Sequence, residues 1–236
     1  MSRAKSVVLA IPLLGSGLRW TWRGIRRFRF GGSSQYWEQR YATEGDSGAG
    51  SYGRLAEFKA RVVNEVVSRE QVESVVELGC GDGNQLTMLR VPRYLGLDVS
   101  RSAVKRCAER FDSDPLKSFA AYDPDAFHDR AGFFRADLAL SMDVLYHLVE
   151  DEVYERYLAH LFGSAERCVL IYSSDVDQPT PVVHVRHRNF TRDVSAAFPS
   201  WDLVEKLKND YAEPDEDGEW SVSDFYLYRR RTSPEG

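Results

Sequence analysis

The strongest chemical signal in the chain is a glycine-rich turn that follows a short run of β-branched residues. Residues 75–84 read VVELGCGDGN, which predicts a strand that runs into three glycines at alternate positions and then into a helix. Glycine permits positive φ and has no Cβ, so a ligand can lie directly against the backbone there. Open parallel sheets bind cofactors at the carboxyl edge of such a strand, and the turn therefore predicts a cofactor site.

A carboxylate at the end of the next predicted strand completes this pattern. Asp98 ends the strand at residues 94–98 and lies 19 residues beyond Gly79. A separation of about 20 residues places such a carboxylate where it accepts hydrogen bonds from both ribose hydroxyls of a bound nucleoside. The turn alone is weak evidence, but the turn and Asp98 together predict an adenosyl cofactor.

A dinucleotide is the competing cofactor, and the details of the turn count against it. Its fingerprint is G-x-G-x-x-G, in which backbone amides hold a pyrophosphate. Here the spacing is G-x-G-x-G, and Asn84 occupies the sixth position. The Glu77 carboxylate would repel a pyrophosphate, whereas it suits a cofactor that carries a sulfonium and a free ammonium group.

These segments resemble the motifs of class I S-adenosylmethionine (SAM)-dependent methyltransferases. The turn resembles motif I, which reads acidic-x-Gly-x-Gly-x-Gly, and Asp98 resembles the ribose-binding acid of motif II. Residues 136–148 resemble motif IV with the loop after it, and residues 36–41 resemble an aromatic helix that covers the cofactor in bacterial members. The resemblance covers about residues 55–230 and implies SAM as the cofactor.

The resemblance also implies a role for individual residues at the cofactor. Those expected around the methionine moiety, the ribose, the adenine and the sulfonium, and those expected to close over the cofactor, are Glu77, Gly79, Cys80, Gly81, Asp98, Val99, Asp123, Ser141, Tyr36 and Tyr52. Asp125 is an alternative to Asp123 at the adenine amino group, because the third predicted strand is poorly defined.

His147 is the candidate general base, and Asp143 is the second residue expected beside the reacting methyl group. Methyl transfer is an in-line displacement, and a hydroxyl acceptor must also lose its proton. An imidazole with an ordinary pKa near 6.5 suits that proton transfer. The alternative is a structural histidine that bonds to backbone in the loop.

The acceptor is expected between the fourth strand and a polar cluster at residues 183–190. The candidate acceptor-binding residues are Tyr146, His184, Arg186 and His187. Two histidines and two arginines could bind a polar or anionic acceptor such as a sugar, carboxylate or phosphate. The alternative is a solvated basic loop that pairs with the acidic segment 213–219.

Three functions remain open at this point. A small-molecule O-methyltransferase that acts on a saccharide or another polyhydroxylated acceptor is favoured. The alternatives are an N-methyltransferase for a small amine and a SAM-binding scaffold without catalysis. Asp143, His147, Asp175 and His184 could converge on a divalent metal, but no ligand spacing in the sequence requires one.

The elements that must position these residues alternate between strands and helices, which predicts a parallel sheet covered on both faces. The fold class is α/β: a Rossmann-like, mostly parallel seven-stranded sheet that ends in an antiparallel hairpin. Strands are predicted at residues 75–78, 93–97, 117–122, 136–141, 168–173, 201–208 and 221–229. Helices are predicted at 36–41, 55–68 and 151–162, from Gln85, and after a cap at Ser100 or Ser102.

The chain of 236 residues divides into a basic and aromatic extension at 1–30, a helical cap at 31–70 and a SAM-binding domain at 71–232. The extension carries seven basic residues and no acidic one. It could pack on the domain or on a second copy of the chain in a homodimer, or lie on an anionic membrane surface. A secretion signal is the third alternative, and Pro12, Gly15 and Gly17, which interrupt the apolar run, count against it. The acidic remainder argues against nucleic acid as a partner. Three widely spaced cysteines fit a reducing compartment, and we expect a cytoplasmic protein.

Overall fold

The computed structural model describes residues 31–214 and 220–231, and those from Gly32 onward belong to one compact unit. The predictions for residues 1–30, including membrane contact and pairing with a second copy, lie outside the described residues. Most of the acidic segment 213–219 lies outside them as well. Within the described residues, no helix is both long enough and apolar enough to cross a membrane.

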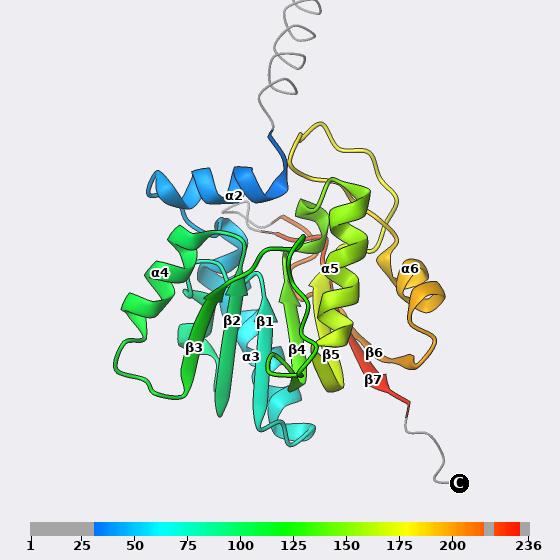
Figure 1. Ribbon diagram of the computed structural model, residues 1–236. Helices are drawn as coiled ribbons and strands as arrows, with labels where there is room; N and C mark the ends of the chain where they lie inside the picture. Colours follow the sequence, from blue (N-terminus) through cyan, green and yellow to red (C-terminus); the bar gives the residue numbers. More distant parts are fainter. Residues whose placement is uncertain (1–30, 215–219, 232–236) are drawn as a thin grey trace, which may run out of the picture. The chain divides into compact units, whose positions relative to one another are not determined.

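A seven-stranded sheet in the order β3-β2-β1-β4-β5-β7-β6 forms the centre of this unit (Figure 1). β7 runs antiparallel to both β5 and β6, and the other neighbours are parallel. This confirms the predicted fold class. The strands are β1 Ser74–Leu78, β2 Arg93–Asp98, β3 Lys117–Ala121, β4 Ala136–Met142, β5 Ala165–Ser173, β6 Trp201–Leu207 and β7 Asp224–Arg230.

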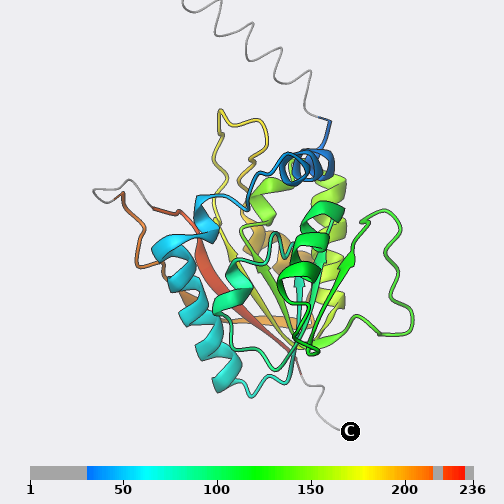
Figure 2. The same ribbon diagram turned by 90° about the vertical axis from the view of Figure 1, so that its left-hand side faces the viewer.

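Two separate apolar cores fill the two faces of the sheet, because successive side chains of a strand point to opposite faces. Helices α3 (Gly53–Arg69) and α4 (Arg101–Arg110) contribute to one core. Helices α5 (Asp151–Gly163) and α6 (Phe190–Ala197) contribute to the other. Figure 2 shows α3 and α5 on opposite sides of the sheet. The strands between them are buried on both faces, which explains their nearly continuous apolar sequence.

Two helices differ from the sequence predictions. The helix expected from Gln85 is only a single 3₁₀ turn, η2 (Gln85–Met88), because Pro92 and the start of β2 leave no room for more. Helix α6 was not predicted, although Asn189 caps it by accepting a hydrogen bond from the Arg192 backbone amide. The predicted cap at Ser100 is confirmed, since its side chain accepts from the Ala103 amide.

Helix α2 (Ser33–Ala42) lies across the carboxyl ends of the strands (Figure 1). Near its start, the Ser33 hydroxyl lies 2.6 Å from Glu150 Oε2, just before α5. Farther along, the Glu38 carboxylate accepts hydrogen bonds of 2.7 Å from the hydroxyls of Ser100 and Ser102, at the start of α4. One short helix is therefore attached to both halves of the sheet, above the edge where the cofactor was predicted.

Candidate functional site

The glycine turn between β1 and η2 has the backbone that the sequence predicted. Gly79, Gly81 and Gly83 have φ of 87°, 59° and 75°, a region that residues with a Cβ seldom adopt. A Cβ on Gly79 would come within 2.5 Å of a methyl carbon of Val144. The Gly79 amide donates to the Leu97 carbonyl oxygen at 2.7 Å, which fixes the turn against β2. The turn is therefore a rigid backbone surface at the edge of the sheet.

Asp98 lies at the end of β2 and connects the turn to the next helix. One carboxylate oxygen accepts from the Gly81 amide at 2.9 Å, and the other accepts from the Ser100 amide at 2.8 Å. Burial raises the pKa of this carboxyl to about 6, although these two hydrogen bonds act in the opposite direction. Each oxygen keeps a further lone pair, so Asp98 can still accept hydrogen bonds from a ligand.

Glu77 is the second buried carboxyl group of the cleft. Burial raises its pKa to about 7, while the hydrogen bond from the Tyr94 hydroxyl and the charge of Lys59 act to lower it. A bound cation would favour the ionised form of both Glu77 and Asp98. The site is thus electrostatically suited to a positively charged ligand and unsuited to a pyrophosphate.

A buried lysine in the cleft was missed by the sequence analysis. Lys59 of α3 has a side chain only 1% exposed, and its ammonium group donates to Asp143 Oδ2 at 2.6 Å. The other oxygen of Asp143 accepts from the Tyr146 hydroxyl at 2.7 Å. The signal was present, because Lys59 lies on the apolar face of its helix, four residues from both Leu55 and Val63. A charge in that position requires a buried partner.

One pocket at the carboxyl edge of the sheet brings many of the predicted residues together. Its lining includes the predicted Glu77, Gly79, Cys80, Gly81, Asp98, Val99, Asp143 and His147. Residues that also line it but were not predicted include Ser33, Trp37, Tyr41, Ser47, Lys59, Asp82, Gln85, Tyr122, Val144 and Tyr157. We call the part formed by Glu77, Gly79, Gly81 and Asp98 the cofactor end, and the part near Trp37 and His147 the acceptor end.

Four residues expected at the cofactor lie elsewhere. Ser141 is fully buried under α5, with its hydroxyl 2.7 Å from the Tyr157 hydroxyl, because it faces the opposite side of β4 from Met142. Asp123 is exposed, while its neighbours Tyr122 and Pro124 line the pocket. The alternative Asp125 is exposed as well, and it pairs with Arg156.

The two tyrosines expected to close over the cofactor also have other partners. The Tyr52 hydroxyl donates to Asp82 Oδ2 at 2.7 Å, beside the glycine turn. The Tyr36 ring stacks on His184, with ring centroids 4.4 Å apart. Neither tyrosine belongs to the lining of the pocket, and the aromatic residues that α2 contributes to it are Trp37 and Tyr41.

His147 is held in one orientation at the acceptor end. Its Nδ1 lies 3.0 Å from the His184 carbonyl oxygen, which can only accept. Nδ1 therefore carries the proton, and Nε2 keeps its lone pair. The Trp37 ring meets the imidazole edge-on at 4.9 Å, and the His184 ring lies nearly parallel to it at 5.7 Å. Burial lowers the pKa of His147 to about 4, so the ring is neutral at physiological pH.

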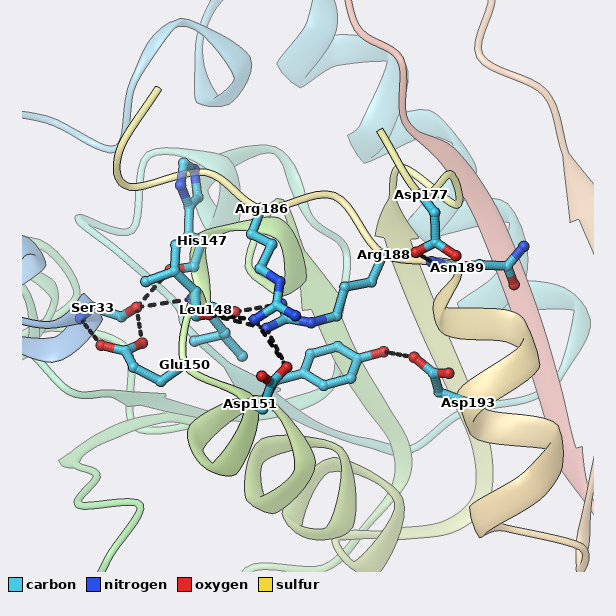
Figure 3. A network of polar contacts seen from close by, with 12 residues as sticks. Ser33, His147, Leu148, Glu150, Asp151, Asp177, Arg186, Arg188, Asn189 and Asp193 are labelled. Carbon is cyan, nitrogen blue, oxygen red and sulfur yellow. Dashed lines mark hydrogen bonds and ion pairs between the residues drawn. The ribbon is translucent and has the colours of Figure 1, made fainter. Parts of the chain in front are cut away.

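The basic cluster after β5 forms a strap, residues 184–188, that is fastened to the loop after β4 (Figure 3). Arg186 and Arg188 both pair with Asp151, at 2.9 and 3.2 Å. His187 Nδ1 lies 2.7 Å from the Ser174 hydroxyl. Tyr146, His184, Arg186 and His187 do not line the pocket. Both guanidinium groups pair with Asp151 within the protein, and binding of an anionic acceptor by this cluster stays a prediction.

The described residues contain no group of three or more His, Cys, Asp or Glu side chains arranged to hold a metal ion. Asp175, which was expected to approach Asp143 and His147, instead accepts hydrogen bonds from the backbone and the hydroxyl of Thr191 at 3.0 and 2.7 Å. Its carboxylate therefore contributes to the start of α6 and not to the pocket.

Comparison with known proteins agrees with this geometry. A family model described as a methyltransferase domain matches residues 76–165, which run from β1 to the start of β5. None of the curated proteins matches the chain. The solved structures that match include SAM-dependent methyltransferases at 14–17% sequence identity.

Three of these structures show how far the likeness extends. N-methyltransferase NodS from Bradyrhizobium japonicum WM9, in complex with S-adenosylhomocysteine (SAH), is 17% identical with a TM-score of 0.64, over 85% of this chain and 100% of that one. Magnesium protoporphyrin IX methyltransferase (ChlM) from Synechocystis PCC 6803, with bound SAH, is 14% identical with a TM-score of 0.58, over 89% and 100%. A SAM-dependent methyltransferase from Anabaena variabilis is 17% identical with a TM-score of 0.60, over 84% and 93%.

At these identities the likeness to solved structures establishes the fold, and the matched domain covers the strand, turn and carboxylate that form the cofactor end. The methyltransferase-domain match covers residues 76–165, and the chain shares the Rossmann-like fold of the SAM-dependent methyltransferases among these structures.

Proposed function

We propose that this chain binds SAM in the pocket and transfers its methyl group to a hydroxyl of a small polar acceptor, with a saccharide or another polyhydroxylated molecule favoured. The observation that carries the proposal is the position of His147 in the pocket. A neutral imidazole of fixed tautomer lines the same pocket as the glycine turn and Asp98. A cofactor site and a candidate base therefore share one cavity.

The residues of the cofactor end fit the chemistry of SAM. When bound, SAM supplies an electrophilic methyl group on a positively charged sulfur. Asp98 keeps the lone pairs needed to accept from the ribose hydroxyls, and the bare backbone at Gly79 and Gly81 leaves room for the methionine moiety. Glu77 supplies negative charge toward the ammonium group. The charge of Lys59 acts to lower the pKa of Glu77, and its ion pair with Asp143 holds the Asp143 carboxylate in place.

The acceptor end supports transfer to a hydroxyl. The acceptor oxygen attacks the methyl carbon, the carbon–sulfur bond breaks with its electron pair on sulfur, and the hydroxyl proton passes to Nε2 of His147. A positioned general base contributes about 10²–10⁴-fold in rate. The lowered pKa makes His147 a weak base, but one that is almost fully deprotonated near neutral pH. Holding the three reacting atoms in line supplies a further part of the acceleration.

A neutral acceptor suits this end better than an anionic one. Arg186 and Arg188 bind Asp151, and Lys59 binds Asp143. The Trp37 and His147 rings offer apolar faces and hydrogen-bonding groups, which suits a polyhydroxylated ring. An amine acceptor is the alternative, and it is favoured by the likeness to the N-methyltransferase NodS. A scaffold that binds SAM without catalysis is the third.

The test combines methyl-labelled SAM with a panel of sugars, phenols and amines, followed by mass spectrometry of the products. We expect label on a hydroxyl, and we expect His147→Ala to lower kcat by at least about 100-fold. The matched control is His128→Ala, because His128 is exposed and does not line the pocket. Both variants should keep the stabilisation by saturating SAH, about 2.7 kcal/mol at 100 times its Kd.

Each contrary result points to a different alternative. Label on amines only, with turnover unchanged in His147→Ala, would establish N-methylation. SAH binding without any labelled product would favour the scaffold. A protein that ignores both SAM and SAH would refute the cofactor assignment itself.

A further inference from the structure

We propose that Arg188, together with Arg186 and Asp151, is a positioning residue for the proposed base His147. These three side chains form a clamp that holds the strap in place, so that the His184 carbonyl keeps the proton of His147 on Nδ1. The clamp consists of the side chains of Arg186, Arg188 and Asp151 (Figure 3). The inference rests on the proposed role of His147 and adds the residues through which the fold enforces it.

Hydrogen bonds join the strap to the loop after β4 at His147 and on both sides of it. The imidazole bonds to the His184 carbonyl on the strap. The strap returns to the loop after β4, because the Arg186 amide donates to the Tyr146 carbonyl at 2.7 Å. Both arginine side chains then donate to carbonyls just after His147, Arg186 to Val149 at 3.0 Å and Arg188 to Leu148. Movement of the strap would therefore break the bond that fixes the tautomer.

Arg188 is the member of the clamp that a substitution would affect most. Its side chain is 8% exposed, and its guanidinium lies 4.3 Å from the centre of the Tyr154 ring. It donates to two carbonyls and to Asp151 from one planar group. Lysine would keep the charge, but it cannot reproduce this fork or the stacking. By contrast, the Arg186 side chain is 47% exposed and makes fewer bonds.

The experiment reads the tautomer directly, by ¹⁵N NMR of the His147 ring in Arg188→Lys and Arg186→Ala. The wild type should show a protonated Nδ1, and both variants should show a mixture in which Nε2 carries part of the proton. The control is Arg192→Lys, since Arg192 forms exposed ion pairs with Asp177 and Asp193 just beyond the strap. It should leave the tautomer unchanged.

Kinetics provide the second readout. With an active acceptor, Arg188→Lys should lower kcat by about 10-fold or more, and by no more than the roughly 10²–10⁴-fold that a positioned base contributes. The KM for SAM should stay within about 2-fold, because the cofactor end is untouched. A fall in kcat that appears with an unchanged tautomer, or an unchanged tautomer in both variants, would overturn the proposal.

A second variant and an acceptor-free measurement distinguish a failure to fold from a failure of the proposal. If Arg188→Lys does not fold, the more exposed Arg186→Ala decides the outcome by the same spectrum. The NMR experiment needs no acceptor, so a shifted tautomer would support the clamp even if methyl transfer by His147 were refuted. Unchanged methyl transfer in His147→Ala would refute the role of His147 as general base. The effect of the clamp on the His147 tautomer would still be decided by the NMR spectra.

Discussion

The two ends of the pocket are built in different ways. The cofactor end is made of backbone and carboxylates from one short stretch, residues 77–98, which runs from β1 through the glycine turn to the end of β2. The acceptor end is made of side chains from α2 and the loop after β4, and His147 in that loop bonds to a carbonyl of the strap; these three segments are far apart in the sequence. The end predicted to hold SAM is therefore a local unit of the chain, whereas the end proposed to hold the acceptor depends on long-range packing.

The largest effect should follow from filling the backbone surface of the cofactor end. In Gly79→Ala the new methyl group would lie 2.5 Å from Val144, and alanine would be held at a φ of 87°. Positive φ costs about 1–2 kcal/mol and overpacking about 1–3 kcal/mol. We therefore expect the losses in the free energy of unfolding and in the free energy of SAH binding to add up to about 3 kcal/mol. Calorimetry with SAH and thermal unfolding measure the two parts.

The matched substitution is Gly163→Ala at the end of α5. Its added methyl group would have no neighbour within 4 Å, and helical alanine is favoured over glycine by about 0.5–1 kcal/mol. This variant should bind SAH normally and unfold at the same or a higher temperature. Equal losses in both variants would show that the glycine turn has no special role.

The next effect concerns the charge pair that joins the two ends. Lys59→Met leaves the Asp143 carboxylate without its cation and should lower the free energy of unfolding by about 3 kcal/mol. This is the lower part of the range for a broken buried pair, because Asp143 keeps the Tyr146 hydroxyl. Urea unfolding measures it, and the double variant Lys59→Met with Asp143→Asn should recover part of the loss. No recovery would mean that Lys59 acts by packing alone.

The smallest effect is the pH dependence of cofactor binding. Burial raises the pKa of Glu77 to about 7 and that of Asp98 to about 6, and a bound cation favours their ionised forms. The affinity for SAM should rise from about pH 5.5 to about pH 8, by up to about tenfold or 1.4 kcal/mol. SAH lacks the sulfonium charge and should depend less on pH. Glu77→Gln should flatten the SAM curve in calorimetry, and an unchanged curve would contradict the assignment.

Without ligand the same two carboxyls act in the opposite direction. The folded chain holds protons that the unfolded chain has released. The contribution of these carboxyls to the free energy of unfolding is therefore most favourable at low pH and is lost as the pH rises toward about 7. His147 acts the other way, since its lowered pKa favours the folded state above about pH 6.5 and costs stability as the pH falls toward about 4. Thermal unfolding of the unliganded protein should therefore be compared with that of Glu77→Gln and His147→Ala.

The sequence predicted the cofactor end because its signals are local. The glycine spacing and the distance from Gly79 to Asp98 depend only on one strand, one turn and the next strand, and both residues lie where they were expected. Most strands were also found from short apolar runs. Ser141 shows the limit, since a change of one residue in a strand reverses the face of the sheet, and the pocket receives Met142 instead.

The acceptor end could not be predicted to the same depth, because its contacts join distant segments. Nothing in the local sequence tells that Arg186 and Arg188 bind Asp151, or that Tyr36 stacks on His184. Those pairings depend on where the strap crosses the loop after β4. Lys59 is the exception, because a lysine within the apolar face of a helix is itself a signal of a buried partner.

Helix α2 is attached at two places above the edge of the sheet that carries the pocket. Ser33, at its start, forms a hydrogen bond with Glu150 just before α5, and Glu38 accepts hydrogen bonds from the serine hydroxyls at the start of α4. Because residues of α2 line the pocket, we expect that release of either attachment would expose a different part of the cavity. For the methyl transfer proposed above, the relative strength of these two sets of hydroxyl–carboxylate bonds would then decide which part of the cavity opens first, and so whether cofactor or product leaves first.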